Sequence, residues 1–349
     1  MTTEHRGAPL GIVEATKGAS WSSDERVLFV EHLAREGLAF YLLGSRPHLQ
    51  HRSALVAFSR NSDAEISRLA PISRSTGLAL GISAFFEEAL VRSSRDISVI
   101  VESLQNADFI GDIKTLLLRF DGAPLRGRHL LADIQVEIVH AISSSFGLTM
   151  QIVVCPTLYA DDVSEIGISD SERDRYRQTL SQIDASVSIF WSGPTLMSDR
   201  ITHGAVERVT EQYQRKPALW YNFPVNDGRG YESRLRLIPE IEDVQQTLGG
   251  FDMVAFNPMR QLRLSEIPII SAMRAIQSRR SDWSDITQTV CIETLGLDVG
   301  EVVWSNITRL DHRDRLWPSI DEAIGLALKG KKSPYALELR TWLDQAPST

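Results

Sequence analysis

Polar side chains that can bind a ligand stand at the points where strand-like apolar runs end. The carboxylates and amides among them are Asp121, Asn222, Asp227 and Asn257. The aromatic side chains of Tyr159 and Trp220 stand beside such run ends as well. Carboxylates and amides hydrogen-bond hydroxyl groups, and aromatic faces pack against rings. This mixture predicts a site for a neutral ligand that carries several hydroxyl groups.

The runs that position these residues recur at intervals of one β-α unit, with segments of helical period between them. They span residues 10–15, 39–44, 78–83, 115–121, 150–156, 187–193, 217–223 and 251–257. The pattern predicts a closed (β/α)8 TIM barrel over residues 1–280, with its chemistry where the strands end. A doubly wound open sheet is the alternative, although no Gly-x-Gly-x-x-Gly follows the first run. Residues 281–349 are expected to form a C-terminal helical extension, a tail packed on the barrel, with a capping box at Ser319 to Glu322.

Composition narrows the class of protein. The 349 residues carry a formal charge of −8, and 43% are hydrophobic, which is typical of a folded globular chain. Without clustered Lys and Arg, nucleic-acid binding is not expected, and no apolar run is long enough for a membrane span. Cys155 and Cys291 stand in apolar surroundings that indicate neither a disulfide nor a zinc site. We therefore expect a cytoplasmic protein, and the sequence leaves open whether it forms a homo-oligomer.

Seven motifs in order along the chain resemble one enzyme family. They are Gly11 to Glu14, Tyr41 to Gly44 followed by His51-Arg52, Phe120-Asp121, Cys155 to Tyr159, Trp191 to Pro194, Trp220 to Asp227, and Asn257 to Met259. Together they resemble the catalytic barrel of glycoside hydrolase family 84, the O-GlcNAcase and bacterial hyaluronidase-like β-N-acetylglucosaminidases, over residues 11–276. The resemblance implies a small amino sugar or glycoconjugate as partner, and neither a cofactor nor a metal.

The resemblance assigns binding roles residue by residue. Asn222, Asp227 and Asn257 match positions that hydrogen-bond the sugar, Tyr159 matches the pocket tyrosine, and Gly11 matches a glycine at the pocket wall. Trp220 stands two residues before Asn222 and so shares its side of the strand.

Two basic residues depart from the family pattern. Arg46 replaces a pocket lysine, and Lys17 replaces an aromatic residue of the first loop. If the two flank one mouth, they indicate an anionic substituent on the ligand.

Catalysis in the family is substrate-assisted, and two adjacent aspartates support it. The ligand's own acetamido oxygen attacks the anomeric carbon, the first aspartate polarises the acetamido N–H, and the second protonates the leaving oxygen. The chain has Asp121 for the first aspartate and Gly122 for the second, and a glycine has no proton to give. The candidates to replace the missing acid are Asp161, Asp162, Glu87, Glu88 and Lys17.

Arg119 is a further departure, with two alternatives. It stands two residues before Asp121 on a predicted strand and so either pairs with that carboxylate or points outward between strand and helix.

Two hypotheses follow. One is an enzyme, a divergent glycosidase or a related transferase or eliminase, that uses Asp121 and an unusual or activated leaving group. The other is a pseudoenzyme that binds a GlcNAc-like sugar as a sensor or assembly partner.

Overall fold

The computed structural model describes residues 7–18, 21–44, 55–58, 61–86, 90–121, 131–162, 168–198, 200–228, 230–239, 242–280, 282–311 and 318–344, with the side chains of 318–320 excepted. Predictions for Arg46, Glu87, Glu88 and Gly122 lie outside the described residues.

Eight strands form a closed parallel barrel, as the spacing of the apolar runs predicts. They are β1 (Leu10–Val13), β2 (Phe40–Leu43), β4 (Ala79–Phe86), β5 (Thr115–Arg119), β6 (Gln151–Cys155), β7 (Ser188–Trp191), β8 (Ala218–Pro224) and β9 (Val254–Asn257). Their order is β2-β1-β9-β8-β7-β6-β5-β4, and the pairing of β2 with β4 closes the ring. The barrel therefore replaces the open-sheet alternative. A two-residue strand that the sequence did not predict, β3 (Val56–Ala57), pairs antiparallel with the end of β4.

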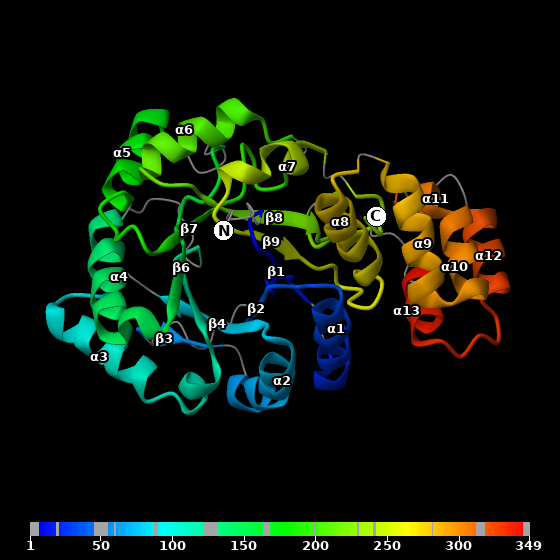
Figure 1. Cartoon of the computed structure of the whole chain (residues 1–349), viewed down its shortest axis with the longest axis horizontal. Helices are drawn as coiled ribbons and strands as arrows, with labels where there is room; N and C mark the ends of the chain where they lie inside the picture. The colour runs from blue at the N-terminus through cyan, green and yellow to red at the C-terminus, as the bar shows by residue number, and fades with distance from the viewer. Residues whose placement is uncertain are drawn as a thin grey trace, which may run out of the picture. The chain divides into compact units, whose positions relative to one another are not determined.

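Helices follow the strands along the chain. They are α1 (Ser23–Arg35), α2 (Ser62–Thr76), α3 (Ser94–Gln105), α4 (Ala132–Phe146), α5 (Asp170–Leu180), α6 (His203–Tyr213), α7 (Glu242–Thr247), α8 (Glu266–Ser278), α9 (Trp283–Leu295), α10 (Leu297–Ser305), α11 (Ile307–Asp311), α12 (Pro318–Ala327) and α13 (Pro334–Asp344). Helices α2 to α6 lie outside the strands (Figure 1). No helix among the described residues is long and apolar enough to cross a membrane.

Local capping signals explain where some helices begin. Ser22 caps α1, and the side chains and backbones of Ser22 and Glu25 form the reciprocal bonds of a capping box. Helix α12 begins at Pro318, and the capping box predicted at Ser319 stays a prediction, because the Ser319 side chain lies outside the described ones. A proline suits the first turn of a helix, where its missing N–H has no intrahelical acceptor to lose.

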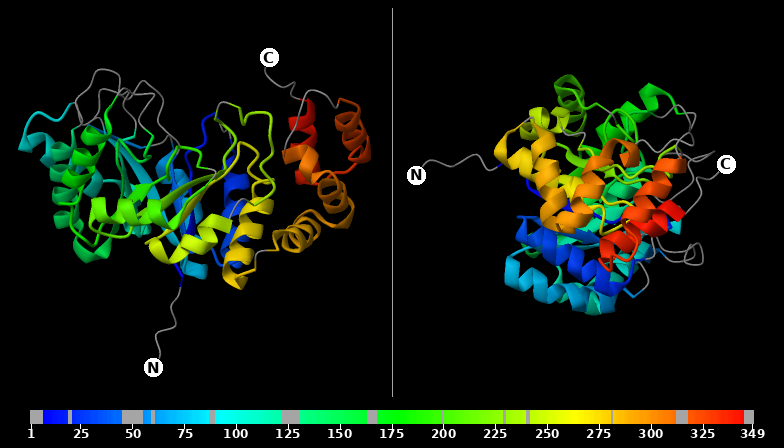
Figure 2. Two further views of the ribbon diagram at one scale, coloured as in Figure 1. Left: turned by 90° about the horizontal axis from the view of Figure 1, so that it is seen from above. Right: turned by 90° about the vertical axis from the view of Figure 1, so that its right-hand side faces the viewer.

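The chain divides into two compact units. The first comprises residues 1–15, 38–222 and 246–255, and it holds the barrel strands except the last residues of β8 and β9. The second comprises residues 16–37, 223–245 and 256–349. In the second unit, helices α9 to α13 pack in succession (Figure 2, orange to red). The domain boundary expected at residue 280 falls between α8 and α9 and stays a prediction.

The interior of the barrel is filled by alternate residues of its strands, because successive side chains of a strand point to opposite faces. Pairs such as Phe40 with Leu42 and Ala218 with Trp220 belong to one buried cluster, which also contains the Cys155 thiol. Gly11 on β1 makes room for this core. A Cβ atom at Gly11 would lie 2.3 Å from ring atoms of Phe40, so the aromatic ring fills the space that a side chain would occupy.

Candidate functional site

Strand β5 ends at Arg119, and its last side chain forms a two-point ion pair with Asp121 in the turn that follows. Arg119 Nε donates to Asp121 Oδ1 at 2.9 Å, and Nη2 donates to Oδ2 at 2.6 Å. Each of the two side chains is 5% exposed. Of the two orientations open to Arg119 from the sequence, the structure has the one that pairs with the carboxylate.

Two aromatic rings hold the Arg119 guanidinium from other strands. Its Cζ atom lies 4.7 Å from the ring centroid of Phe85 on β4 and 4.8 Å from that of Trp220 on β8. Burial acts to lower the pKa of Arg119, but the Asp121 carboxylate outweighs it, and the net pKa is raised. The third nitrogen, Nη1, is buried and has no hydrogen-bond partner among the described residues.

Trp220 and Asn222 form the next part of this group, on β8. Trp220 Nε1 donates to Asn222 Oδ1 at 2.9 Å, and Asn222 Nδ2 donates to the Leu196 carbonyl at 2.7 Å. The Trp220 ring belongs to the barrel core and is 1% exposed, whereas Asn222 is partly exposed. Tyr159, in the loop after β6, lies with its ring centroid 5.7 Å from that of Trp220. The structure thus brings four of the predicted site residues together in the first unit, because Asp121 joins them through Arg119.

Asp161, one candidate for the missing acid, is held in a network of polar contacts. Its Oδ1 accepts from Trp191 Nε1 at 2.8 Å and lies 2.8 Å from Nη1 of the buried Arg177. The backbone N–H groups of Asp161 and Asp162 donate to carbonyls of the loop after β7, Gly193 at 3.1 Å and Pro194 at 2.8 Å. These bonds join the loops after β6 and β7. Asp162 is exposed.

In the second unit, Lys17 and Asp227 form another group. The Lys17 backbone N–H donates to Asp227 Oδ2, and the Lys17 carbonyl accepts from Arg260 Nε at 3.0 Å. Gly18 has φ +70°, so the turn that carries Lys17 favours a glycine at this position. Trp21 Nε1 donates to the Arg260 carbonyl at 2.7 Å. The Lys17 side chain is exposed, as an anion-binding role requires.

Asn257, at the end of β9, belongs to the same group. Its Oδ1 lies 3.4 Å from Thr16 Oγ1, which is next to Lys17 in the chain. The buried Asn226 holds the loop that follows, because its Oδ1 accepts from Arg260 N at 3.0 Å and its Nδ2 donates to Gln261 at 2.8 Å. Asn226, Arg260 and Phe85 are not among the residues predicted from the sequence for the site. Asn226 could have been predicted from its position inside the motif from Trp220 to Asp227.

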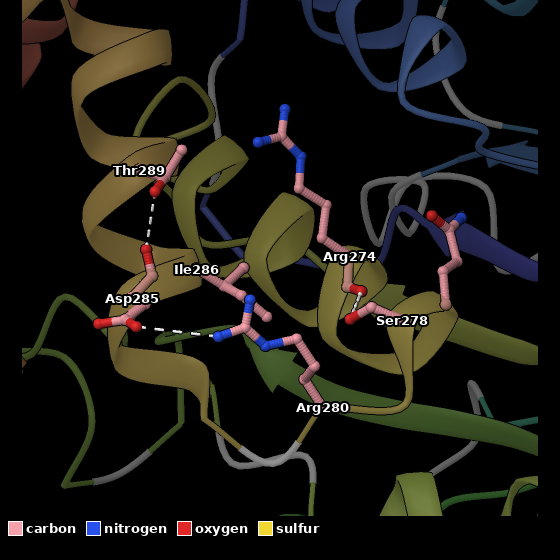
Figure 3. A pocket seen from close by; sticks show the side chains of 7 residues that line it. Arg274, Ser278, Arg280, Asp285, Ile286 and Thr289 are labelled. Atoms are coloured by element: carbon pink, nitrogen blue, oxygen red, sulfur yellow. Dashed lines mark hydrogen bonds and ion pairs between the residues drawn. The ribbon is translucent and has the colours of Figure 1, made fainter.

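A cavity of about 490 Å³ lies between α8 and α9 in the second unit (Figure 3). Its cations have acidic partners. Arg274 pairs with Glu36 at 2.8 Å and Glu293 at 2.6 Å, and Arg280 lies 3.8 Å from Asp285. We assign no ligand to this cavity. Within the described part of the chain, no group of three or more His, Cys, Asp or Glu residues is arranged to hold a metal ion.

A closed parallel eight-stranded barrel with carboxylates and amides where its strands end is a (β/α)8 TIM barrel whose polar groups gather where such barrels carry their sites. The family model described as beta-N-acetylglucosaminidase matches residues 10–291, and the chain belongs to this family. Protein O-GlcNAcase from Rattus norvegicus and that from Mus musculus are each 22% identical over 232 residues, which is 62% of this chain. The chain spans about a quarter of the length of these curated relatives, 24% in each case.

Among solved structures, a mutant O-GlcNAc hydrolase from Thermobaculum terrenum has the same fold, with a TM-score of 0.78 and 19% identity. The match covers 95% of this chain and 80% of that one. The match therefore includes most of the C-terminal helices.

Proposed function

We propose that the protein is a divergent glycosidase that acts on an N-acetylated amino sugar or its conjugate, with Asp121 as the group that recognises the acetamido N–H. The observation that carries the proposal is the buried Asp121 carboxylate, held at the end of β5 in a chain of the beta-N-acetylglucosaminidase family. The names of the relatives, protein O-GlcNAcase and O-GlcNAc hydrolase, support a GlcNAc conjugate as the substrate class.

The proposed step uses the ligand's own amide as the nucleophile. The acetamido oxygen attacks the anomeric carbon, and the bond from that carbon to the leaving oxygen breaks with its electron pair on the leaving group. As the amide N–H becomes more acidic, it donates a hydrogen bond to the Asp121 carboxylate. Water then attacks the anomeric carbon of the oxazolinium ion, the bond from that carbon to the acetamido oxygen breaks with its electron pair on the amide, and the water loses a proton to the departed anion or to solvent.

The glycine at position 122 limits the kinds of leaving group that we expect the protein to release, because a glycine cannot protonate the leaving oxygen. General acid catalysis typically contributes about 10² to 10⁴ in rate, so a leaving group that needs a proton is expected to depart very slowly. An activated leaving group, which departs as a stable anion, loses much less. The substrates best suited to this chain therefore carry such a group.

The test compares the 4-nitrophenyl and 4-methoxyphenyl β-N-acetylglucosaminides, whose leaving groups differ in acidity. We expect the wild type to hydrolyse the nitrophenyl glycoside far faster, and Asp121→Asn to be slower on both by about 10² or more. Gly122→Asp should narrow the difference by raising the methoxyphenyl rate. Equal rates for the wild type and Asp121→Asn would exclude the enzymatic proposal.

A second candidate function is a pseudoenzyme that binds the sugar without converting it. The glycine at position 122 together with Lys17 in the first loop favours this alternative, because a chain without a proton donor can bind the sugar and fail to cleave it. Calorimetry with N-acetylglucosamine and with its oxazoline-like thiazoline analogue separates the two. Tight binding without turnover supports the pseudoenzyme, and binding of neither compound removes both proposals.

A further inference from the structure

We propose that Arg119 is a positioning residue that fixes the Asp121 carboxylate as an ionised acceptor for the ligand's amide N–H and so keeps Asp121 from taking over the missing role of proton donor. The inference rests on the proposed function for its ligand. It concerns a residue that acts through Asp121 in this proposal.

The geometry of the ion pair fixes the orientation of the Asp121 carboxylate. The planar fork of Arg119 meets both carboxylate oxygens, at 2.9 Å and 2.6 Å, so it fixes the plane of the carboxylate. An ionised carboxylate has about four lone-pair sites. The two bonds of the fork therefore do not by themselves use the full accepting capacity of a carboxylate.

The guanidinium is itself held in place. Phe85 and Trp220 contact it from β4 and β8, two strands of the closed barrel. Because Nη1 is already buried without a partner, rotation that released Asp121 would leave further buried donors unpaired. The barrel therefore stabilises a single orientation of the Arg119 side chain, and through it a single orientation of Asp121.

The same pair determines the proton state. The attraction between the two charges is reciprocal, so the contact that favours the charged form of Arg119 also favours the ionised form of Asp121. Among the described residues, the other titratable groups that act on Arg119 are Cys155 on β6 and Tyr159 in the loop after it. To donate a proton, Asp121 would first have to become neutral and leave a buried guanidinium without its counter-charge.

The experiment compares the wild type with Arg119→Met and Arg119→Lys. One readout is carbon-13 NMR of the aspartate carboxyl groups, in which Asp121→Asn identifies the Asp121 signal. The second is calorimetric binding of the thiazoline analogue between about pH 4 and pH 8. Arg177→Met is the matched control, because it removes an equally buried arginine from the neighbouring Asp161. Circular dichroism establishes that each variant is folded.

In Arg119→Met, a buried carboxyl group without its counter-charge takes up a proton at higher pH. We therefore expect its NMR titration to move to higher pH, and thiazoline affinity to fall by about tenfold per pH unit below that titration. Arg119→Lys keeps the charge without the fork, so it should retain the wild-type pH profile with weaker binding. This variant tests the inference if Arg119→Met fails to fold. Arg177→Met should leave the Asp121 titration unchanged.

An Asp121 titration that is the same in the wild type and in Arg119→Met would overturn the inference, and so would a profile in Arg119→Lys shifted as far as that of Arg119→Met. The proposed function fails in a different way. In that case the wild type binds no thiazoline at any pH, while the carboxyl titration still depends on Arg119 and supports the assignment of this residue.

Discussion

At the scale of single residues, two arginine–aspartate pairs differ in their proposed roles: one takes part in the proposed chemistry and the other is structural. Arg119 holds Asp121, the proposed acceptor of the acetamido N–H, whereas Arg177 holds Asp161 in a network with Trp191. Removal of one partner from a buried pair typically costs about 3 to 5 kcal/mol, because the other charge is left uncompensated. The two aspartates should therefore be distinguished by kinetics and not by stability.

The first prediction concerns Asp161, one candidate for the missing acid. Asp161→Asn should lower the free energy of unfolding by about 2 kcal/mol, a reduced value because this carboxylate is partly exposed to solvent. Its effect on the ratio of nitrophenyl to methoxyphenyl hydrolysis should be negligible. Urea unfolding and steady-state kinetics provide the two measurements. A ratio that rises by about 10² in this variant would identify Asp161 as the proton donor after all.

The second prediction concerns Gly11 and the packing of the barrel interior. Gly11→Ala places a methyl group 2.3 Å from the buried ring of Phe40, so we expect a loss of about 1 to 3 kcal/mol in the free energy of unfolding. Gly111→Ala is the matched control, because nothing lies within 4 Å of the added methyl group there. Similar stabilities of the two variants in chemical denaturation would contradict this account.

At the scale of elements, the C-terminal helix α13 stabilises the loop that follows β9. Glu338 Oε2 accepts from Leu264 N at 2.8 Å, and Tyr335 donates to Glu266 at 2.7 Å. Glu266 also pairs with His32 of α1 at 2.6 Å, and the hydrogen bond to Glu266 raises the pKa of His32. A helix far along the chain is thus bonded to the residues just after Asn257.

The third prediction is a pH dependence of stability at Glu338. Burial raises the pKa of Glu338 to about 7. Hydrogen bonds from the backbone N–H groups of Leu264 and Arg263 act to lower this pKa. The charge of Arg263 also lowers it, and the charge of Glu25 raises it. A carboxyl group whose folded-state pKa is raised contributes stability below its unfolded pKa, and this contribution is lost as the pH rises through about 7.

Glu338→Gln removes this dependence, since an amide does not titrate. Relative to the wild type, the variant should gain on the order of 2 kcal/mol between about pH 4.5 and pH 7. Urea unfolding at a series of pH values measures the difference. A difference that stays constant across this range would mean that Glu338 does not titrate there.

The elements were largely predictable because their signals are local. Eight apolar runs at β-α spacing specified the strands, and Ser22 with Glu25 specified the start of α1. Strand β3 was missed because two residues are too few to show a period. The orientation of Arg119 could not be predicted, because it depends on Phe85 and Trp220, which only the closed barrel brings beside it.

At the scale of the whole molecule, segments of the two units alternate along the chain. The residues predicted for the site are divided between the two units. Asp121, Tyr159 and Asn222 belong to the first unit, and Asp227 and Asn257 belong to the second. The second unit also contains the whole C-terminal extension, so its stability depends on residues outside the family match, which ends at residue 291.

The fourth prediction tests this dependence by ending the chain after Gly330, which removes α13. The truncated chain loses the buried side chains of Leu339 and Trp342 and the Glu338 bonds, so we expect several kcal/mol lower stability of the second unit. Thermal and urea unfolding measure this loss. Leu337→Ser, on the exposed side of the same helix, should leave stability nearly unchanged. Wild-type stability of the truncated chain would show that α13 contributes nothing.

Because both thiols are buried, neither native cysteine is expected to react with a thiol-directed label in the folded protein. Cys155 is buried in the barrel core, and burial raises the pKa of the Cys291 thiol to about 12. Because the thiolate is the reactive form, a maleimide should leave both untouched in the folded chain. A cysteine introduced at Leu196, which is 51% exposed and whose carbonyl accepts from Asn222, would be labelled selectively. A fluorophore there would report ligand binding without any need for turnover.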